Sequence, residues 1–264
     1  RVLWGVHPYD IKSINLLDLM FKTTNKDEHY LRRRENTFIV GIDPKRASEK
    51  SFWAVMEADK IERGFDLMLT DIGEEYTVTV GTQRGQKMLD RYGIFTKATD
   101  AQVQERDKVK KNLKNLCSPE RKLNFSLEAL PYLLMKAYDA DIWKEKAEKC
   151  FSCGSCNFVC PTCYCFDVQD KVSEDLKYGE RYRVWDGCLL QNFAVVATGE
   201  NFRKERYQRY RHRFYRKGLY IKREYGEFAC VGCGRCAISC LSGIADPIEV
   251  YNEVFNYLKG AVIL

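Results

Sequence analysis

The chain has 264 residues, of which 12 are cysteines, and a formal net charge of +6. This length allows a sizeable hydrophobic core and favours two domains over one. No stretch has the form of a signal peptide or the length of a membrane span, so we expect no membrane association, and the cysteine usage indicates a reducing cytoplasm.

Residues 1–120 are predicted to form an α/β domain. The sequence starts at Arg1 and enters the apolar run Val2–Trp4 at once, from which we expect that an N-terminal portion precedes it. Short apolar runs bounded by turn-forming residues predict strands. Such runs lie at 2–6, 37–42, 65–70 and 76–80. The short connection between the last two predicts a hairpin.

Two helices are predicted among these strands. Apolar residues recur at helical spacing over 11–21, and Pro8 suits the first turn of that helix. A second helix is predicted over 84–91, with Gly93 as its stop.

No nucleotide site is predicted in this part of the chain. It contains neither a G-x-G-x-x-G fingerprint after a strand nor a G-x4-G-K-[ST] loop. His7, Asp10 and Asp43 are polar residues near predicted strand ends, but such residues more often cap elements or lie at the surface. We therefore assign them no chemistry.

A charged stretch over 101–114 is predicted to be helical, and Cys117–Pro119 ends it, so the domain boundary is placed near residue 120. The single Cys117 is expected to be an ordinary thiol. Residues 121–264 are predicted to form a mainly α-helical domain, which makes the fold class α+β overall.

Two helices are predicted before the first group of cysteines. Pro131 suits the first turn of one helix, and Asp139 or Asp141 caps the next. The second helix carries Trp143 and leads into Cys150, so it determines the direction from which the cysteine loop is presented.

The most informative stretch is CFSCGSCNFVCPTCYC, residues 150–165. Its first four cysteines and the following proline have the spacing C-x2-C-x2-C-x3-C-P, which in bacterial ferredoxins holds [4Fe-4S] clusters. A second run, CVGCGRCAISC over 230–240, repeats the spacing without the proline. We therefore predict two [4Fe-4S] clusters.

The ligands follow from crossed ligation, in which the fourth cysteine of each run binds the other cluster. The first cluster is assigned Cys150, Cys153, Cys156 and Cys240, and the second Cys230, Cys233, Cys236 and Cys160. Gly154, Gly232 and Gly234 suit such loops because glycine tolerates positive φ. A zinc site needs no third cysteine in each run, and disulfide frameworks belong to small secreted chains, so both alternatives are weaker.

These clusters alter the charge balance. Eight ligating thiolates add about −8 and two oxidised cores about +4, which leaves the holoprotein near +2. The basic composition is therefore weak evidence for a nucleic-acid partner.

The segment 161–229 between the two runs is long and is expected to be filled by helices. It contains Cys163, Cys165 and Cys188, three cysteines beyond the eight assigned. One hypothesis is a further metal site or a thiol redox site. The alternative, packing against the clusters, is favoured because no fourth ligand is obvious.

Residues 203–223 contain ten Lys or Arg and a single acid, Glu205. Tyr207, Tyr210 and Phe214 fall on one helical face and are predicted to be core residues. For the basic face, a solvated surface and a docking field for an acidic redox partner are equally favoured. A nucleic-acid stripe, as in a redox-sensing nucleic-acid binder, is the weaker alternative, so no nucleic-acid partner is expected.

Several segments together resemble the beta subunit of cytoplasmic [NiFe] sulfhydrogenases and the 4Fe-4S dicluster electron-transfer subunit of anaerobic sulfite reductase. They are residues 4–18, 30–43, 64–73, 153–170, 183–188, 201–218 and 230–240. The resemblance implies a non-catalytic electron-transfer subunit. It implies two partners, which are a flavin-containing subunit that oxidises NAD(P)H and a catalytic subunit with its own clusters.

The chain departs from this family near its N-terminus. Relatives carry a cysteine in the segment matching 7–10 and further cysteines in the segment matching 43–54, whereas this chain has Tyr9, Ser51 and Phe52 there. The resemblance therefore implies that an additional N-terminal cluster has been lost and that the α/β part is a docking scaffold. Leu241 also replaces a proline that follows the second run in relatives.

Overall fold

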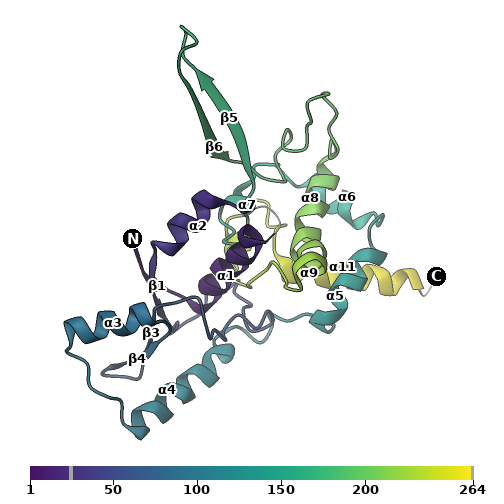
Figure 1. Cartoon of the computed structure of the whole chain (residues 1–264). Coiled ribbons are helices and arrows are strands. Elements are labelled where there is room, and N and C mark those ends of the chain that lie inside the picture. The colour runs from purple at the N-terminus through teal and green to yellow at the C-terminus, as the bar shows by residue number, and fades with distance from the viewer. Residues whose placement is uncertain (24–25, 263–264) are drawn as a thin grey trace. The chain divides into compact units, whose positions relative to one another are not determined.

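The computed structural model describes residues 1–23 and 26–262, which divide into two compact units. The first contains Arg1–Leu123 and Glu227–Gly234, and the second contains Asn124–Gly226 and Arg235–Leu264. Helices and strands are mixed, as the α+β prediction requires (Figure 1). Among the described residues, no helix is both long and apolar enough to cross a bilayer.

A four-stranded sheet organises the first unit. Its strands are β1 (Val2–Val6), β2 (Phe38–Ile42), β3 (Leu67–Asp71) and β4 (Tyr76–Val80), and they lie in that order across the sheet. The first three strands are parallel, whereas β4 pairs antiparallel with β3. All four strands and the final hairpin were predicted from short apolar runs.

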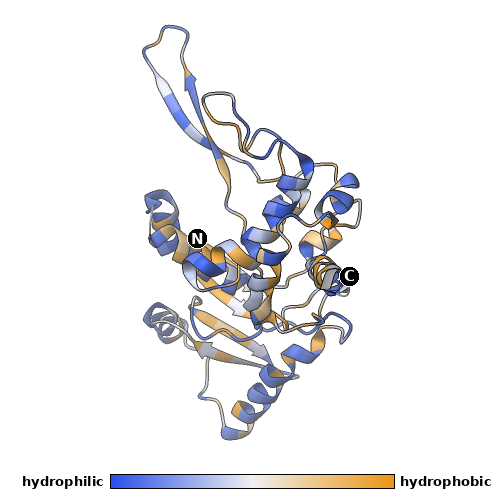
Figure 2. Cartoon of the chain, turned by 90° about the vertical axis from the view of Figure 1, so that its right-hand side faces the viewer, coloured by the Kyte–Doolittle hydropathy of each residue, from blue (hydrophilic) through white to orange (hydrophobic). Residues whose placement is uncertain are grey.

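Helices connect and cover these strands. They are α1 (Pro8–Lys22), α2 (Glu28–Glu35), α3 (Gln83–Tyr92) and α4 (Asp100–Asn112), and a short 3-10 turn, η1 (Leu113–Leu116), follows. Ile11 of α1 packs on Ile39 and Met68 of the sheet, which forms a buried core. The predicted helix ends at Pro8 and Gly93 are confirmed. α4 is largely hydrophilic (Figure 2).

The loop between β2 and β3 is also well packed. Phe52 and Trp53 are buried, and the ring of Trp53 stacks on Tyr9 with centroids 4.9 Å apart. The buried Cys117 contacts the backbone of Trp53 and Ala54. Bulky aromatic side chains therefore occupy the two segments in which relatives were expected to carry cysteines.

The second unit is built mainly from helices. They are α5 (Leu130–Lys136), α6 (Ile142–Glu148), α8 (Arg206–Tyr215), α9 (Ile221–Tyr225) and α11 (Pro247–Val262), with a 3-10 turn, η2 (Leu127–Ala129), before α5. A π-helical turn, η3 (Arg216–Tyr220), joins α8 to α9. Trp143 of α6 packs against Tyr210, Phe214 and Tyr215 of α8, which confirms the predicted aromatic core face.

The expectation that helices alone fill 161–229 is wrong. Strands β5 (Phe166–Val172) and β6 (Gly179–Trp185) form an antiparallel hairpin whose residues are nearly all exposed (Figure 1). Cross-strand pairs hold it, including the ion pair between Arg181 and Asp170. The hairpin begins directly after Cys165 and ends shortly before Cys188, so it brings these two distant cysteines close together in the fold.

Candidate functional site

The first cysteine loop starts where α6 ends. Cys150 and Cys156 are buried, Cys153 is exposed, and the short helix α7 (Ser155–Phe158) carries Cys156. Gly154 has φ of 76°, and a Cβ atom there would lie 2.9 Å from the ring of Phe158. A glycine is therefore required for the chain to turn between Cys153 and α7.

The second cysteine loop repeats this local geometry. A short helix, α10 (Arg235–Ile238), follows Cys233 and carries Cys236, as α7 carries Cys156. In each loop the last cysteine contacts a hydroxyl group two residues further on. Cys160 Sγ lies 3.3 Å from Thr162 Oγ1, and Cys240 Sγ lies 3.6 Å from Ser242 Oγ. The two sequence motifs are thus two copies of one structural motif.

Three of the four predicted ligands of the first cluster are neighbours in the second unit. Burial, together with the nearby charges of Cys236, Cys240 and Cys150, raises the pKa of the Cys156 thiol to about 11, although Arg213 acts to lower it. Cys153 stays at the surface, with its sulfur 3.4 Å from Ser155 Oγ. The backbone N–H of Ser152 points at Cys150 Sγ from 3.4 Å. Close thiols with donors aimed at sulfur fit an anionic cluster.

The predicted ligands of the second cluster are divided between the units. Cys160 and Cys236 lie in the second unit, and both act electrostatically on Arg213. Cys230 and Cys233 belong to the first unit, where Ser51 donates to the carbonyl oxygen of Cys233. The assignment of these four residues to one cluster stays a prediction from spacing.

A buried arginine lies among the cysteines of the second unit. Arg213 is 2% exposed, and its Nη2 donates to the carbonyl oxygen of Cys156 over 3.2 Å. Burial acts to lower the pKa of Arg213, but the charges of neighbouring cysteines hold it well above its usual value. Those cysteines are Cys156, Cys236, Cys160 and Cys163. A buried cation facing cysteines fits thiolates that stay ionised as metal ligands.

The expectation of a solvated or docking basic face over 203–223 is wrong for four of its residues. Arg209, Arg211, Arg213 and Lys217 are all buried. Arg209 donates to the carbonyl oxygen of Leu189 and to Ser152 Oγ, and Arg211 donates to the carbonyl oxygen of Tyr138. In the sequence, these basic residues alternate with the aromatic core residues, and this alternation was the one signal that their side chains face inward.

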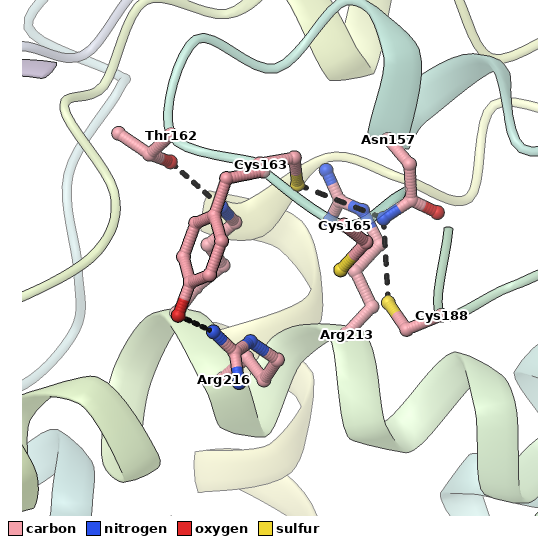
Figure 3. A pocket seen from close by; sticks show the side chains of 9 residues that line it. Asn157, Thr162, Cys163, Cys165, Cys188, Arg213 and Arg216 are labelled. Atoms are coloured by element: carbon pink, nitrogen blue, oxygen red, sulfur yellow. Dashed lines mark hydrogen bonds between the residues drawn. The ribbon is translucent and has the colours of Figure 1, made fainter. Parts of the chain in front are cut away.

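The three further cysteines are brought together in the second unit. Cys163, Cys165 and Cys188 line one small pocket with Asn157, Arg213, Arg216 and Lys217 (Figure 3). The sequence-based preference for thiols that pack against the clusters stays a prediction, and the fold adds that all three thiols lie at one pocket.

The polar residues near the N-terminus have structural roles. His7 Nδ1 lies 3.1 Å from the carbonyl oxygen of Ile42, and Thr70 donates to Asp43 over 2.6 Å. Asp10 lies in the first turn of α1, where its carbonyl oxygen accepts from Ser13.

Comparison with known proteins agrees with the cysteine chemistry. A family described as a 4Fe-4S dicluster domain matches residues 149–244. Sulfhydrogenase 2 subunit beta of Pyrococcus furiosus (strain ATCC 43587 / DSM 3638 / JCM 8422 / Vc1) is 36% identical over 257 residues, which cover 96% of this chain and 73% of that protein. No solved structure matches the chain.

Proposed function

The chain belongs to the sulfhydrogenase beta-subunit family, and from that premise we propose that it relays single electrons between two other subunits of a cytoplasmic, anaerobic oxidoreductase complex. The donor or acceptor on one side is a flavin-containing NAD(P)H oxidoreductase subunit. On the other side is a catalytic subunit with its own clusters, of hydrogenase or sulfite-reductase type. The chain itself carries no substrate chemistry.

Two [4Fe-4S] clusters supply the one-electron chemistry in this proposal. Cys150, Cys153, Cys156 and Cys240 hold one, and Cys230, Cys233, Cys236 and Cys160 hold the other. The observation that carries the proposal is the surroundings of Cys156, where Cys236, Cys240 and Cys150 all lie close enough to act on it electrostatically, although Cys236 and Cys240 are far from it in sequence. The spacing of a crossed two-cluster ferredoxin predicts this neighbourhood.

The surrounding residues stabilise negative charge. The Ser152 N–H and the Thr162 and Ser242 hydroxyls contact cysteine sulfurs, and Arg213 places a buried positive charge beside the same loops. Each electron that arrives adds one negative charge, so these groups favour the reduced state.

We assign residues 1–120 to a docking scaffold and residues 121–264 to an alpha-helical ferredoxin-like domain. Support for a scaffold without its own cluster comes from the stacked Tyr9 and Trp53, which fill the segments where relatives carry cysteines. The alternative of a nucleic-acid binder loses support because Arg209, Arg211, Arg213 and Lys217 are buried.

The relay is tested by reconstitution. The anaerobically purified chain is mixed with NAD(P)H, alone and with the flavin-containing subunit that copurifies with it, and cluster bleaching is followed by absorbance. We expect reduction only when the flavin subunit is present. Rapid reduction by NAD(P)H without that subunit, or no reduction with it, would contradict the proposed place of the chain between two partners.

A further inference from the structure

Three cysteines outside the proposed ligand sets line one pocket, and two of them contact the buried amide of Asn157. Asn157 Nδ2 lies 3.3 Å from Cys188 Sγ and 3.7 Å from Cys163 Sγ (Figure 3). Cys165 is close enough to Cys188 for the two sulfurs to interact electrostatically. Two segments of chain, one with Cys163 and Cys165 and one with Cys188, therefore present three thiols to one place.

The hairpin explains how Cys165 and Cys188 meet. Phe166 and Trp185 are paired at its base, and the N–H of Asp186 donates to the carbonyl oxygen of Cys165 over 3.2 Å. The pairing thus holds the residues before β5 beside those after β6. An isolated two-stranded hairpin is marginally stable in water, so a bound group that ties its base to α8 would stabilise it.

Three cations face the same pocket from one side. Arg213, Arg216 and Lys217 are three and four residues apart, which puts them on one face of the α8–η3 segment. Arg216 donates to the Tyr164 hydroxyl over 2.5 Å, and Lys217 donates to Thr162 Oγ1 over 2.6 Å. Buried cations are stable when negative charge lies nearby. Thiolates bound to metal supply that charge, and neutral thiols do not.

Buried polar atoms at the pocket point to a missing partner. Asn157 is 3% exposed and Arg213 is 2% exposed. Asn157 Oδ1, Arg213 Nε and Arg213 Nη1 have no hydrogen-bond partner, although buried polar atoms are nearly always paired. The two arginine donors suit anionic sulfur as an acceptor.

The arrangement of the three thiols favours an iron–sulfur cluster over a single zinc ion. A structural zinc ion needs ligands that converge on one point. Among the side chains that the structure describes, no group of three His, Cys, Asp or Glu is arranged to hold a single metal ion. A cluster instead offers a separate iron to each thiolate, so its ligands are spread around a larger body.

We propose that Cys163, Cys165 and Cys188 bind a third iron–sulfur cluster of the [4Fe-4S] type, whose fourth iron takes a ligand other than cysteine. Asn157 and Arg213 donate to its sulfur atoms. The cluster adds to the electron relay proposed above and lies next to the first ferredoxin-type run, because Cys163 is hydrogen-bonded to Cys160 and Arg213 faces both.

The test is the iron and acid-labile sulfide content of the full chain, purified anaerobically, and of its Cys165→Ser and Cys188→Ser variants. We expect about twelve irons in the unchanged chain and about eight in each variant. Cys117→Ser is the matched control, because Cys117 is a buried cysteine of the first unit, and it should keep about twelve.

About eight irons in the unchanged chain, with no loss in either variant, would overturn the third cluster and leave the two-cluster relay intact. Zinc in place of the additional iron would also overturn it. If the variants do not fold, spin counting on the unchanged, dithionite-reduced chain decides, since three reduced clusters support the proposal and two refute it.

Discussion

Arg213 Nη2 lies 3.2 Å from the carbonyl oxygen of Cys156, which fixes a buried positive charge against the first cysteine loop. The same guanidinium is close to Cys160, Cys163 and Cys236. Arg213, which lies between the two cysteine runs in the sequence, therefore acts on cysteines of both runs.

Removing this charge should lower the cluster potentials. In Arg213→Met, the reduced and more negative state loses a buried cation that faces four cysteines, so reduction becomes harder by on the order of tens of millivolts. An EPR-monitored redox titration measures the shift. Arg223→Gln, which removes an exposed arginine from the same basic segment, should leave the potentials unchanged. Equal potentials in all three proteins would show that Arg213 does not tune the clusters.

Crossed ligation predicts which pairs of cysteine variants lose the same cluster. Cys240→Ala and Cys156→Ala should abolish the EPR signal of the same cluster, whereas Cys160→Ala and Cys236→Ala should abolish that of the other. Ser242→Ala removes only the hydroxyl beside Cys240 and should retain both signals. If Cys240→Ala instead affects the same signal as Cys236→Ala, each run ligates its own cluster.

Two glycines with similar backbone angles should respond differently to alanine. Gly234 and Gly243 have φ of 78° and 70°, but a Cβ at Gly234 would lie 2.6 Å from the Lys50 backbone, whereas at Gly243 it would meet nothing within 4 Å. We expect Gly243→Ala to lose about 1–2 kcal/mol of unfolding free energy from backbone strain alone. Gly234→Ala should lose at least about 2 kcal/mol more, because backbone must move. Chemical denaturation measures both, and equal losses would show that the loop 227–234 does not pack on residue 50.

The Asp66 carboxylate should make stability depend on pH. Burial acts to raise the pKa of Asp66, but hydrogen bonds from Arg84, Thr82 and the Ile39 N–H outweigh it and hold the pKa below its usual value. The stabilisation is therefore present above the unfolded-state pKa and is lost as the pH falls through the lower folded-state value.

Asp66→Asn should accordingly cost about 1.5–3 kcal/mol of unfolding free energy near pH 7, and the difference should shrink below about pH 4. Denaturant titrations at several pH values measure this dependence. Glu74→Gln, at an exposed position, is the control and should change little. A difference that stays constant down to low pH would contradict the role of the charge.

The parts predicted well from sequence were those with a strong local signal. The strands of the first unit are short apolar runs, and α1 has apolar residues at helical spacing. Helix α2 was missed because only Tyr30 and Leu31 of its eight residues are not charged or strongly polar, so no apolar stripe marks it. It depends on the Asp27 cap and on Asp18, which pairs with Tyr30 and Arg34.

The missed parts of the site depend on long-range contacts. Strands β5 and β6 lack a buried face, and the partial alternation of Phe166, Val168 and Val172 is a weak signal for a strand. Lys and Arg are normally solvated, and the burial of Arg213 becomes intelligible only when the cysteines that face it, some of them more than fifty positions earlier, are in place. The convergence of Cys163, Cys165 and Cys188 requires the same hairpin and could not be derived from their spacing.

The central claim is that this chain holds at least two interacting [4Fe-4S] clusters, and EPR of the dithionite-reduced, anaerobically purified chain tests it most directly. We expect a broad signal from magnetically coupled reduced clusters, together with at least about eight irons per chain. A simple uncoupled signal with about four irons or fewer would contradict it.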